Sequence, residues 1–331
     1  MIYKISNARW SSVGDAAIYD VQAAGLSRLG WFVTESVEQC DAIILGGGGT
    51  LYQPDQHVDR TFYGLQCGMH FKDLAETLYN NDSIPFYVLG AGCQDFGSRP
   101  ALRQAWRDLL GMTTGISVRD NYSKTKLASD LLLPSGLIDR ICVYPDPVFE
   151  LYNEADNIMS NSNLIMISAR WQNIDALMSL LEKLRESYKL VWCPMEQADY
   201  EHYLQYKDQR DYLQASSFFG RYFPDYRLYL NTLRKCFMNI SDRLHAFIFS
   251  LITGRGILSL YDLKGNQKVT GLVDDRFGTV GYPYRLAGGD TNTCLAYIQE
   301  MDKNRQEIFN QFNNIALVSS LQAKKHYSIL L

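Results

Sequence analysis

The sequence has no long hydrophobic run and no excess of basic residues. Nowhere in its 331 residues do about 18 apolar residues follow one another without a charge, so we expect no membrane-spanning helix. The first residues also lack the apolar core of a secretory signal. The formal net charge of −4 leaves no overall basic field that would hold a nucleic acid backbone. These absences predict a soluble cytoplasmic protein without a nucleic acid partner.

The cysteines and histidines form no recognisable metal or disulfide pattern. Seven cysteines are widely spaced and include no C-x-x-C pair, which argues against a disulfide framework and a zinc ribbon. The histidines other than His245 show no ligand spacing with Cys, Asp or Glu, and H-E-x-x-H is absent. No G-x-S-x-G motif supports a covalent hydrolase. We therefore expect reduced core cysteines and no metal.

Short apolar runs that end in glycine or polar residues alternate with helical patterns, which is typical of βα units in a parallel sheet. With 47% hydrophobic and 21% charged residues, the chain has the composition of a globular protein. In the first half, the pattern predicts strands at 2–6, 42–45, 86–90, 115–119 and 141–144, and helices near 15–29, 64–79, 99–110 and 121–131. The fold class is therefore α/β.

The length suggests two domains, because one core seldom grows past about 250 residues. Residues 153–163 are polar and aperiodic, so we place the boundary there, between domains 1–155 and 156–331. The second half restarts with strands at 164–169, 190–193, 236–240 and 256–260, and helices near 173–187, 198–208, 226–234, 242–253 and 291–313. We expect two Rossmann-like domains that face each other across a cleft.

In parallel sheets, ligands bind outside the carboxyl ends of the strands, and several polar or glycine-rich segments follow predicted strands. Asp15 opens a helix, where it is either an N-cap or a ligand contact. Gly46–Gly49 follow a buried strand and match neither the Walker nor the dinucleotide pattern. These glycines either let a ligand approach the backbone or pack a tight βα turn.

Two further strand ends carry charged residues. Arg119 and Asp120 either form a mutual salt bridge, or Asp120 caps the next helix and leaves Arg119 free to reach into the cleft. Tyr144–Val148 places Asp146 between two prolines, and this rigid turn favours a structural role.

Ser241–Phe247 is the most informative segment. It begins a helix, with Ser241 or Asp242 as the expected cap, and it puts Arg243 and His245 in the first turn. Additional positive charge is unfavourable at a helix N-terminus unless an anion binds there. Lys264, after the next strand, would bring a third cation to the same edge. The alternative is a solvated Lys264 and a hydrogen-bonded core His245.

Several motifs, in this order and spacing, resemble the polysaccharide pyruvyl transferase family. They are S-x-G-D-A-A-I, D-A-I-I-L-G-G-G-G-T-L, I-S-V-R-D, Y-P-D-P-V-F, I-S-A-R, S-D-R-L-H-A and Y-D-L-K, within residues 12–264. The resemblance implies a fold like the GT-B glycosyltransferases. It also implies transfer of pyruvate from phosphoenolpyruvate to a sugar of a cell-surface polysaccharide, as a ketal, with no cofactor besides this donor.

The resemblance also implies roles for individual residues. Arg243, Leu244 and His245 would bind the donor in the C-terminal domain, with Lys264 beside them and His245 as acid or base. Arg119 matches the Arg-Asp motif of the family. Asp15, Gly47, Gly48 and Gly49 would hold the acceptor sugar in the N-terminal domain, with Asp15 as a base for its hydroxyl.

Two other functions stay open at this point. A GT-B glycosyltransferase would place the diphosphate of a nucleotide sugar at the same helix N-terminus, and a non-catalytic member of an envelope-polymer assembly would only bind sugar. The acceptor is either soluble or a lipid-linked oligosaccharide, and the latter would bring the protein to the inner face of the membrane.

Overall fold

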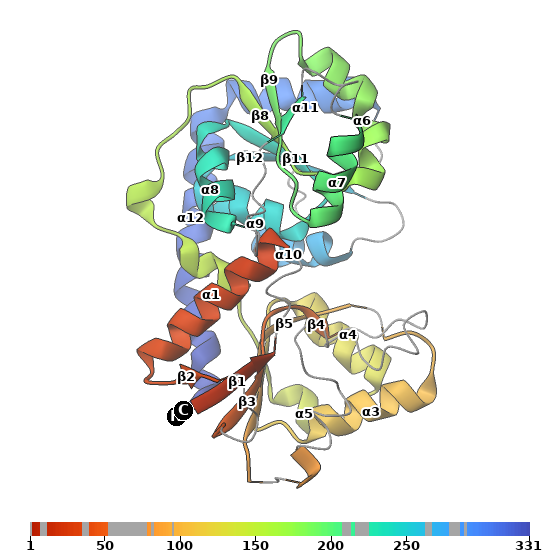
Figure 1. The fold of residues 1–331 in the computed structure, drawn as a ribbon, viewed down its shortest axis with the longest axis vertical. Helices are drawn as coiled ribbons and strands as arrows, with labels where there is room; N and C mark the ends of the chain where they lie inside the picture. Colours follow the sequence, from red (N-terminus) through yellow and green to blue (C-terminus); the bar gives the residue numbers. More distant parts are fainter. Residues whose placement is uncertain are drawn as a thin grey trace. The chain divides into compact units, whose positions relative to one another are not determined.

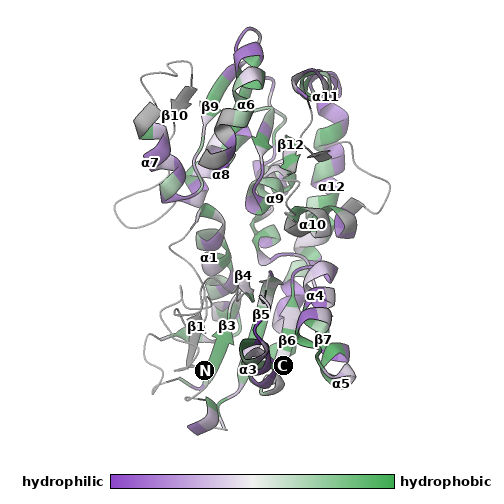
Figure 2. Ribbon diagram, turned by 90° about the vertical axis from the view of Figure 1, so that its right-hand side faces the viewer, coloured by the Kyte–Doolittle hydropathy of each residue, from purple (hydrophilic) through white to green (hydrophobic). Residues whose placement is uncertain are grey.

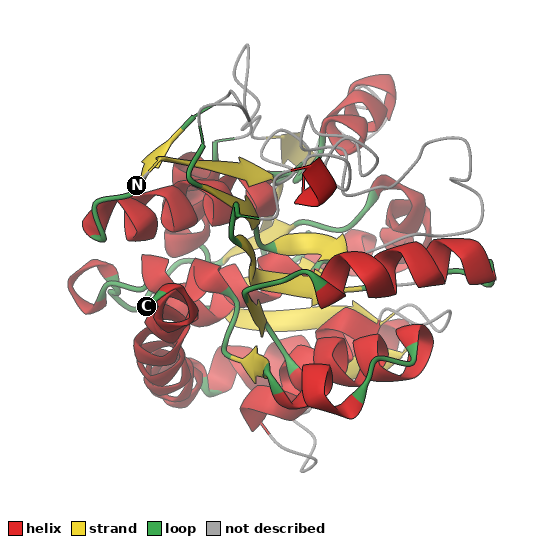
Figure 3. Ribbon diagram, turned by 90° about the horizontal axis from the view of Figure 1, so that it is seen from below, coloured by secondary structure: helices red, strands yellow, loops and turns green. Residues whose placement is uncertain are grey.

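The chain forms two compact units in a computed structural model. The structure describes residues 2–6, 12–34, 40–51, 78–80, 83–94, 96–206, 213–215, 225–261, 267–277, 285–287 and 290–331. Unit 1 comprises Met1–Arg9, Asp15–Glu150 and Ser319–Leu331, and unit 2 comprises Trp10–Gly14 and Leu151–Val318. Within each unit, parallel strands lie between helices (Figure 3), which confirms the α/β class.

Unit 1 contains a parallel sheet in the order β2-β1-β3-β5-β6-β7, with β4 paired to β5. The strands are β1 (Ile2–Ser6), β2 (Phe32–Val33), β3 (Ala42–Leu45), β4 (Gly48–Leu51), β5 (Phe86–Cys93), β6 (Gly115–Val118) and β7 (Ile141–Val143). The helices are α1 (Val13–Arg28), α3 (Pro100–Gly111), α4 (Asn121–Leu131) and α5 (Ser135–Asp139), with 3-10 turns η3 (Pro147–Leu151) and η6 (Lys324–Leu330). Figure 1 shows α3, α4 and α5 together on one side of this sheet.

Alternating side chains of the central strands fill two separate cores in unit 1. Ile43 and Leu45 of β3 pack with α3, α4 and α5 through residues such as Trp106. Ala42 and Ile44 point the other way, into a cluster with α1 and with Tyr327 near the end of the chain. This period of two explains why the strand reads as a continuous apolar run, because both of its faces are buried.

Unit 2 contains a parallel sheet in the order β10-β9-β8-β11-β12-β13. Its strands are β8 (Leu164–Ile167), β9 (Lys189–Trp192), β10 (Leu213–Ala215), β11 (Met238–Ser241), β12 (Gly256–Tyr261) and β13 (Arg285–Ala287). Numbered within the unit, this order is 3-2-1-4-5-6, that of the Rossmann fold. Its helices are α6 (Trp171–Leu184), α7 (Gln197–Tyr206), α8 (Tyr226–Lys235), α9 (Leu244–Thr253), α10 (Gln267–Phe277), α11 (Thr291–Lys303) and α12 (Arg305–Ala323), with a 3-10 turn η4 (Glu154–Asp156).

Helix α9 is the most buried helix described in unit 2. Nine of its ten residues are buried, so it is apolar on all sides, as expected of a helix inside a core. By contrast, α8 has one buried face, formed by Tyr226, Tyr229, Leu230 and Leu233. Figure 2 colours strands such as β3 as mainly hydrophobic, whereas α7 carries hydrophilic residues. No described helix is long and apolar enough to cross a membrane.

The polar segment 153–163 is bound to unit 2, although the sequence predicted a linker there. Asn157 donates hydrogen bonds to the carbonyl oxygen of Ile252 (2.8 Å) and to Asn313 (2.7 Å). Ser162 donates to the carbonyl of Lys235 at 2.5 Å. The polar side chains thus satisfy backbone groups of neighbouring helices. The division between the units falls after Glu150, and not at 155/156.

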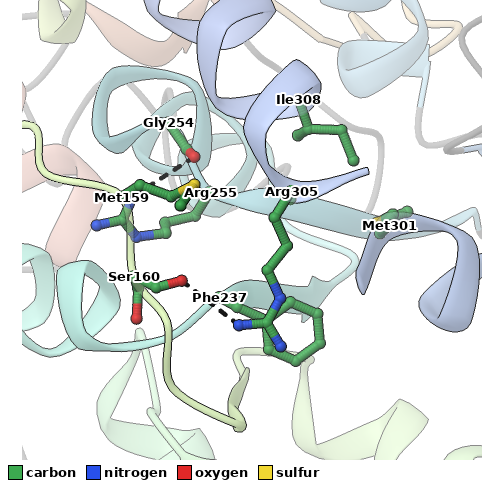
Figure 4. Close-up of a pocket in the computed structure, with 9 residues that line it drawn as sticks. Met159, Ser160, Phe237, Gly254, Arg255, Met301, Arg305 and Ile308 are labelled. Carbon is green, nitrogen blue, oxygen red and sulfur yellow. Dashed lines mark hydrogen bonds between the residues drawn. The ribbon is translucent and has the colours of Figure 1, made fainter. Parts of the chain in front are cut away.

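The same segment is held by a buried arginine beside a small cavity (Figure 4). Arg255 donates to the carbonyls of Ile158 (2.5 Å) and Arg234 (2.8 Å), and Gly254 provides a longer contact at 3.5 Å. Burial lowers the pKa of Arg255 to about 10. Carbonyls at the ends of α8 and α9 supply negative partial charge that stabilises the cation. The cavity measures about 10 Å³, close to what one water requires, so it is no ligand pocket.

Several other elements differ from the sequence-based expectation. The helix predicted at 291–313 is two helices, α11 and α12, which meet at Asn304. The strands β2, β4, β10 and β13 were not predicted, and three of them have only two or three residues. The C-terminal residues Ser319–Leu331 belong to unit 1, although the sequence assigned them to the second domain. The helix predicted at 64–79 lies mostly outside the described residues.

His326 fixes the C-terminal segment in unit 1. Its Nε2 lies 2.7 Å from the carbonyl oxygen of Pro145 and its Nδ1 lies 2.8 Å from the hydroxyl of Ser117. A carbonyl only accepts, so Nε2 carries the proton and Nδ1 accepts from Ser117. Ser117 in turn accepts from the backbone N–H of Gly90 at 3.1 Å. Burial lowers the pKa of His326 to about 4, because a charged ring would lose its water, and the hydrogen bond to Pro145 and the charge of Asp146 offset only part of this loss.

We expect this histidine to make the stability of the protein depend on pH. The pKa of His326 is about 4 in the folded chain and near 6.5 in an unfolded one, so the unfolded chain takes up the proton first as pH falls. Its contribution to stability is complete above about pH 6.5. The free energy of unfolding should fall by about 3 kcal/mol between pH 6.5 and pH 4, as measured by urea denaturation.

The variant His326→Gln should lose most of this pH dependence, because the amide can still donate to Pro145 but does not titrate. The matched control is His202→Gln in α7, which removes a histidine from unit 2 and leaves His326 in place. An unchanged pH dependence in His326→Gln, or its loss in His202→Gln, would refute this assignment.

Candidate functional site

The strand order of unit 2 defines one place where a ligand is expected. Strands β8 and β11 are neighbours in the sheet, but β8 leads to β9 on one side and β11 leads to β12 on the other. The two connections leave a crevice outside the carboxyl ends of β8 and β11, and ligands of doubly wound sheets bind at this switch point. The segment Ser168–Arg170 follows β8, and Asp242 and Arg243 follow β11, which ends at Ser241.

Asp242 joins the two segments. Its carboxylate accepts hydrogen bonds from the backbone N–H of Arg170 (2.9 Å), the guanidinium of Arg170 (3.1 Å) and the side-chain amide of Asn173 (2.6 Å). Ser241 adds a bond from its hydroxyl to the carbonyl of Ser168 at 2.9 Å. The buried carboxylate therefore fixes the start of α6 against the end of β11.

The caps of the two helices differ from the expectation that Ser241 or Asp242 caps the helix. Arg243 is the N-cap of α9 and Arg170 is the N-cap of α6, and neither side chain makes a capping hydrogen bond. The helix begins at Leu244 instead of residue 242, because Asp242 binds the other segment. The first amides of an α-helix have no partner within the helix, so both N-termini are suited to an anion.

Arg243 is a fixed cation with an exposed fraction of only 7%. Its guanidinium forms ion pairs with Glu196 and with Asp199, which is buried. Burial alone would lower the pKa of Arg243, but the two carboxylates raise it above its ordinary value. No described residue accepts a hydrogen bond from its Nε. Arg170 is 38% exposed, and the exposed fraction of Glu196 is 43%, so both can meet a ligand from solvent.

His245 lies against the first turn of α1. A Cβ atom on Gly14 would lie 2.0 Å from Nδ1 of His245, which no side chain could tolerate. The N–H of Val13 donates to the carbonyl of Met195 at 2.9 Å and holds this turn in place. The glycine of the S-x-G-D motif therefore allows the close approach of His245. The side chain of Leu244 is buried, so a substrate contact from this residue would use its backbone amide.

Unit 1 has its own switch point, between β1 and β3, since β1 leads to β2 and β3 leads towards β5. Asp15 in the first turn of α1 and the glycines after β3 follow these strands. Gly48 has φ +94°, and a Cβ there would lie 2.9 Å from Oδ1 of Asp15. The structure thus brings together Asp15 and the glycine segment, as the sequence predicted for this edge.

Close packing accounts for part of this glycine segment. The N–H of Gly47 donates to Gln22 at 3.0 Å, while the amide of Gln22 donates to the carbonyl of Leu89 at 2.6 Å. A Cβ on Gly47 would lie 2.8 Å from Ile18 and 3.0 Å from the carbonyl oxygen of Gly90. The segment is also no simple loop, because β4 begins at Gly48 and pairs with β5. Gly49 is partly exposed.

Arg119 is not free to reach a ligand, and this corrects the open expectation from the sequence. It is 3% exposed and lies between Asp120 (3.2 Å) and Asp146 (3.6 Å). Asp120 also accepts from the N–H of Ser123 at 2.6 Å, so it both pairs with Arg119 and caps α4. Asp146 accepts from the N–H of Val148 at 3.0 Å, in keeping with a structural turn. Arg119 therefore has a structural role in this conformation.

Two further points concern the remaining predicted residues. Lys264 lies outside the described residues. Arg170 was not among the predicted site residues, although it ends the I-S-A-R motif after a predicted strand. Arg170 belongs to the same switch point as Arg243 because β8 and β11 are neighbours, and the sequence does not show this strand order. The one signal in the sequence was that Arg170 directly follows a predicted strand. Among the described residues, no cluster of three or more His, Cys, Asp or Glu side chains is arranged to hold a metal.

Known structures share this fold at low sequence identity. The UDP complex of MnaA from S. aureus is 10% identical with a TM-score of 0.56, and the match covers 94% of this chain and 90% of that one. Anabaena Alr3699/HepE in complex with UDP-glucose is 11% identical with a TM-score of 0.55, and the match covers 97% of this chain and 94% of that one. UDP-GlcNAc 2-epimerase from Methanocaldococcus jannaschii is 10% identical with a TM-score of 0.52, and the match covers 90% of this chain and 92% of that one. These similarities define a GT-B-like α/β fold.

Within this class, the chain belongs to the polysaccharide pyruvyl transferase family. The model of that family matches residues 2–260, which include both switch points. Among curated proteins, none matches the chain. This match confirms the resemblance that the ordered motifs indicated.

Replacing Gly14 by Ala should displace His245, because the added methyl group would overlap the imidazole ring. We expect a loss of stability of about 1 to 3 kcal/mol in urea denaturation, the usual cost of overpacking a well-packed site. The NMR signal of the His245 ring should also shift in a histidine-labelled sample.

The matched control is Gly111→Ala in α3, where an added Cβ meets nothing within 4 Å. This variant should be as stable as the parent or slightly more stable, since Ala favours helix. If Gly14→Ala behaved like Gly111→Ala and left the His245 signal in place, the proposed contact would be wrong.

Proposed function

We propose that the protein transfers pyruvate from phosphoenolpyruvate to two hydroxyls of a sugar, as a ketal, in the synthesis of a cell-surface polysaccharide. The observation that carries this proposal is the position of Arg243-Leu244-His245 at the N-terminus of α9, at the switch point of unit 2. Family membership supports a transferase of this kind.

The donor carries a phosphate and a carboxylate, and both need partners when they leave water. The first amides of α6 and α9 and the half-exposed guanidinium of Arg170 are available for one of these groups. The other group would replace the half-exposed carboxylate of Glu196 on Arg243, while the buried Asp199 stays. Lys264 is a further cation for the donor, as the family resemblance implies.

The proposed reaction begins with a proton added to the methylene carbon of the donor, with His245 as the acid. The adjacent carbon becomes oxocarbenium-like, and a sugar hydroxyl attacks it and loses its proton to a base, for which we propose Asp15. Phosphate then leaves, and the second hydroxyl attacks the same carbon and loses its proton. The products are the ketal and inorganic phosphate. In this proposal, Gly47, Gly48 and Gly49 contact the acceptor sugar in unit 1.

A second candidate is transfer of a sugar from a nucleotide donor. It is favoured by the similarity to structures that contain UDP or UDP-glucose. The diphosphate of such a donor would use the same helix N-terminus, because both ligands present phosphate oxygens. A lipid-linked acceptor would, for either reaction, bring the protein to a membrane surface.

Calorimetric titration should show that phosphoenolpyruvate binds and that UDP does not. The variant Arg170→Ala should bind phosphoenolpyruvate roughly 10-fold more weakly, the usual effect of losing one charged hydrogen bond. Arg243→Lys should weaken binding similarly, because a single ammonium replaces a guanidinium that contacts several groups. His245→Gln should retain the donor affinity within about 3-fold and lose phosphate release in the presence of saccharide acceptors.

Arg185→Ala is the control, since this half-exposed arginine lies at the end of α6 opposite Arg170. It should leave the affinity unchanged. Binding of UDP alone would support the nucleotide-sugar reaction instead. A His245→Gln variant with normal phosphate release would remove His245 from acid catalysis.

A further inference from the structure

Unit 1 has a second pocket, away from its switch point. The pocket measures about 450 Å³, and its described lining includes Tyr79, Arg107, Asp108, Pro134, Leu137 and Arg140. Arg140 directly precedes β7 and bonds to the carbonyls of Thr113 and Thr114, which directly precede β6. The pocket therefore lies at the amino ends of these strands, whereas Asp15 and the glycine segment follow the carboxyl ends.

Both arginines of the pocket are held in place by backbone carbonyls. Arg107 donates from Nε to the carbonyl of Leu131 at 2.6 Å and from Nη1 to Gln104 at 2.5 Å. Arg140 donates from Nη2 to Thr113 (2.9 Å) and Thr114 (3.1 Å). Their other donors make no hydrogen bond or ion pair with described residues. Two positioned guanidinium groups with unused donors are suited to an oxyanion.

The rest of the lining is aromatic and apolar. Tyr79 is 69% exposed, and Leu137 is a buried residue of α5. Exposed aromatic rings offer an apolar face and a polar edge, which suits a sugar ring that has both kinds of surface. A volume of about 450 Å³ is within the range of small-molecule sites, which is about 300 to 1,000 Å³.

The charges of the lining limit the ligand further. Arg107 and Arg140 contribute two positive charges and Asp108 one negative charge, so the described lining has a net charge of +1. Asp108 accepts a hydrogen bond from Gln104 at 2.6 Å and is not paired with either arginine. A single carboxylate would neutralise this pocket, whereas a diphosphate would leave uncompensated negative charge.

From these features we propose that this pocket binds a saccharide that carries one carboxylate. Arg107 and Arg140 bind the carboxylate, and the sugar ring lies against Tyr79. The site is separate from the proposed active site and holds a polymer chain without acting on it. The pyruvate ketal would supply such a carboxylate, and this link alone rests on the proposed function. Affinity for acidic saccharides in general does not depend on it.

The test uses a digalacturonate mono-methyl ester, which has one carboxylate, as the acidic probe and the neutral disaccharide lactose as the comparison, with binding followed by NMR titration. We expect the acidic probe to bind at least 10-fold more tightly than lactose. Arg140→Gln and Tyr79→Ala should each weaken binding of the acidic probe at least 5-fold. Tyr79→Ala alters only an exposed side chain, so it tests the site without loss of the fold.

Arg99→Gln, at the opposite end of α3 from the pocket, is the control and should leave binding of the acidic probe unchanged. Arg243→Lys should also leave it unchanged, while Arg140→Gln should leave phosphoenolpyruvate binding unchanged. The two proposals can thus fail separately. Equal affinity for lactose, tighter binding of UDP at these residues, or an equal loss in Arg99→Gln would each overturn the proposal.

Discussion

The buried carboxylate of Asp242 is the interaction on which the candidate site of unit 2 depends. Three hydrogen bonds from Arg170 and Asn173 connect it to the start of α6, although these residues are about 70 positions away in sequence. A buried carboxylate that lost these donors would have a large desolvation cost, so the contact fixes one geometry. As a result, the N-termini of α6 and α9, each with an arginine at its N-cap, lie where the strand order reverses.

Unit 1 also has a switch point, but different residues surround it. Around Asp15, the backbone of Gly48 approaches so closely that a side chain would collide, and Gln22 ties Gly47 to β5. Here the charge is a carboxylate, and the surrounding surface is largely backbone. The helix N-termini and arginines at the switch point of unit 2, and the carboxylate and backbone groups at that of unit 1, agree with the proposed division into an anionic donor and a sugar acceptor.

The sequence predicted the elements that have clear periodicity and end in recognisable residues, such as β3 and α4. It left the role of Arg119 undecided, because the distant partner Asp146 becomes visible only when β6 and β7 are paired. Ser241 or Asp242 was expected to cap the helix that follows, and in sequence a cap looks the same as a contact to another helix. The polar residues 153–163 looked like a linker because hydrogen bonds to distant carbonyls leave no periodic pattern.

Amide hydrogen exchange, with and without phosphoenolpyruvate, tests the central claim most directly, because it reports which helix N-terminus receives the anion. If the donor binds at the switch point of unit 2, it should slow exchange in the first turns of α6 and α9 and leave residues 42–51 of unit 1 unchanged. Slower exchange confined to residues 42–51, with no change in α6 and α9, would contradict the account.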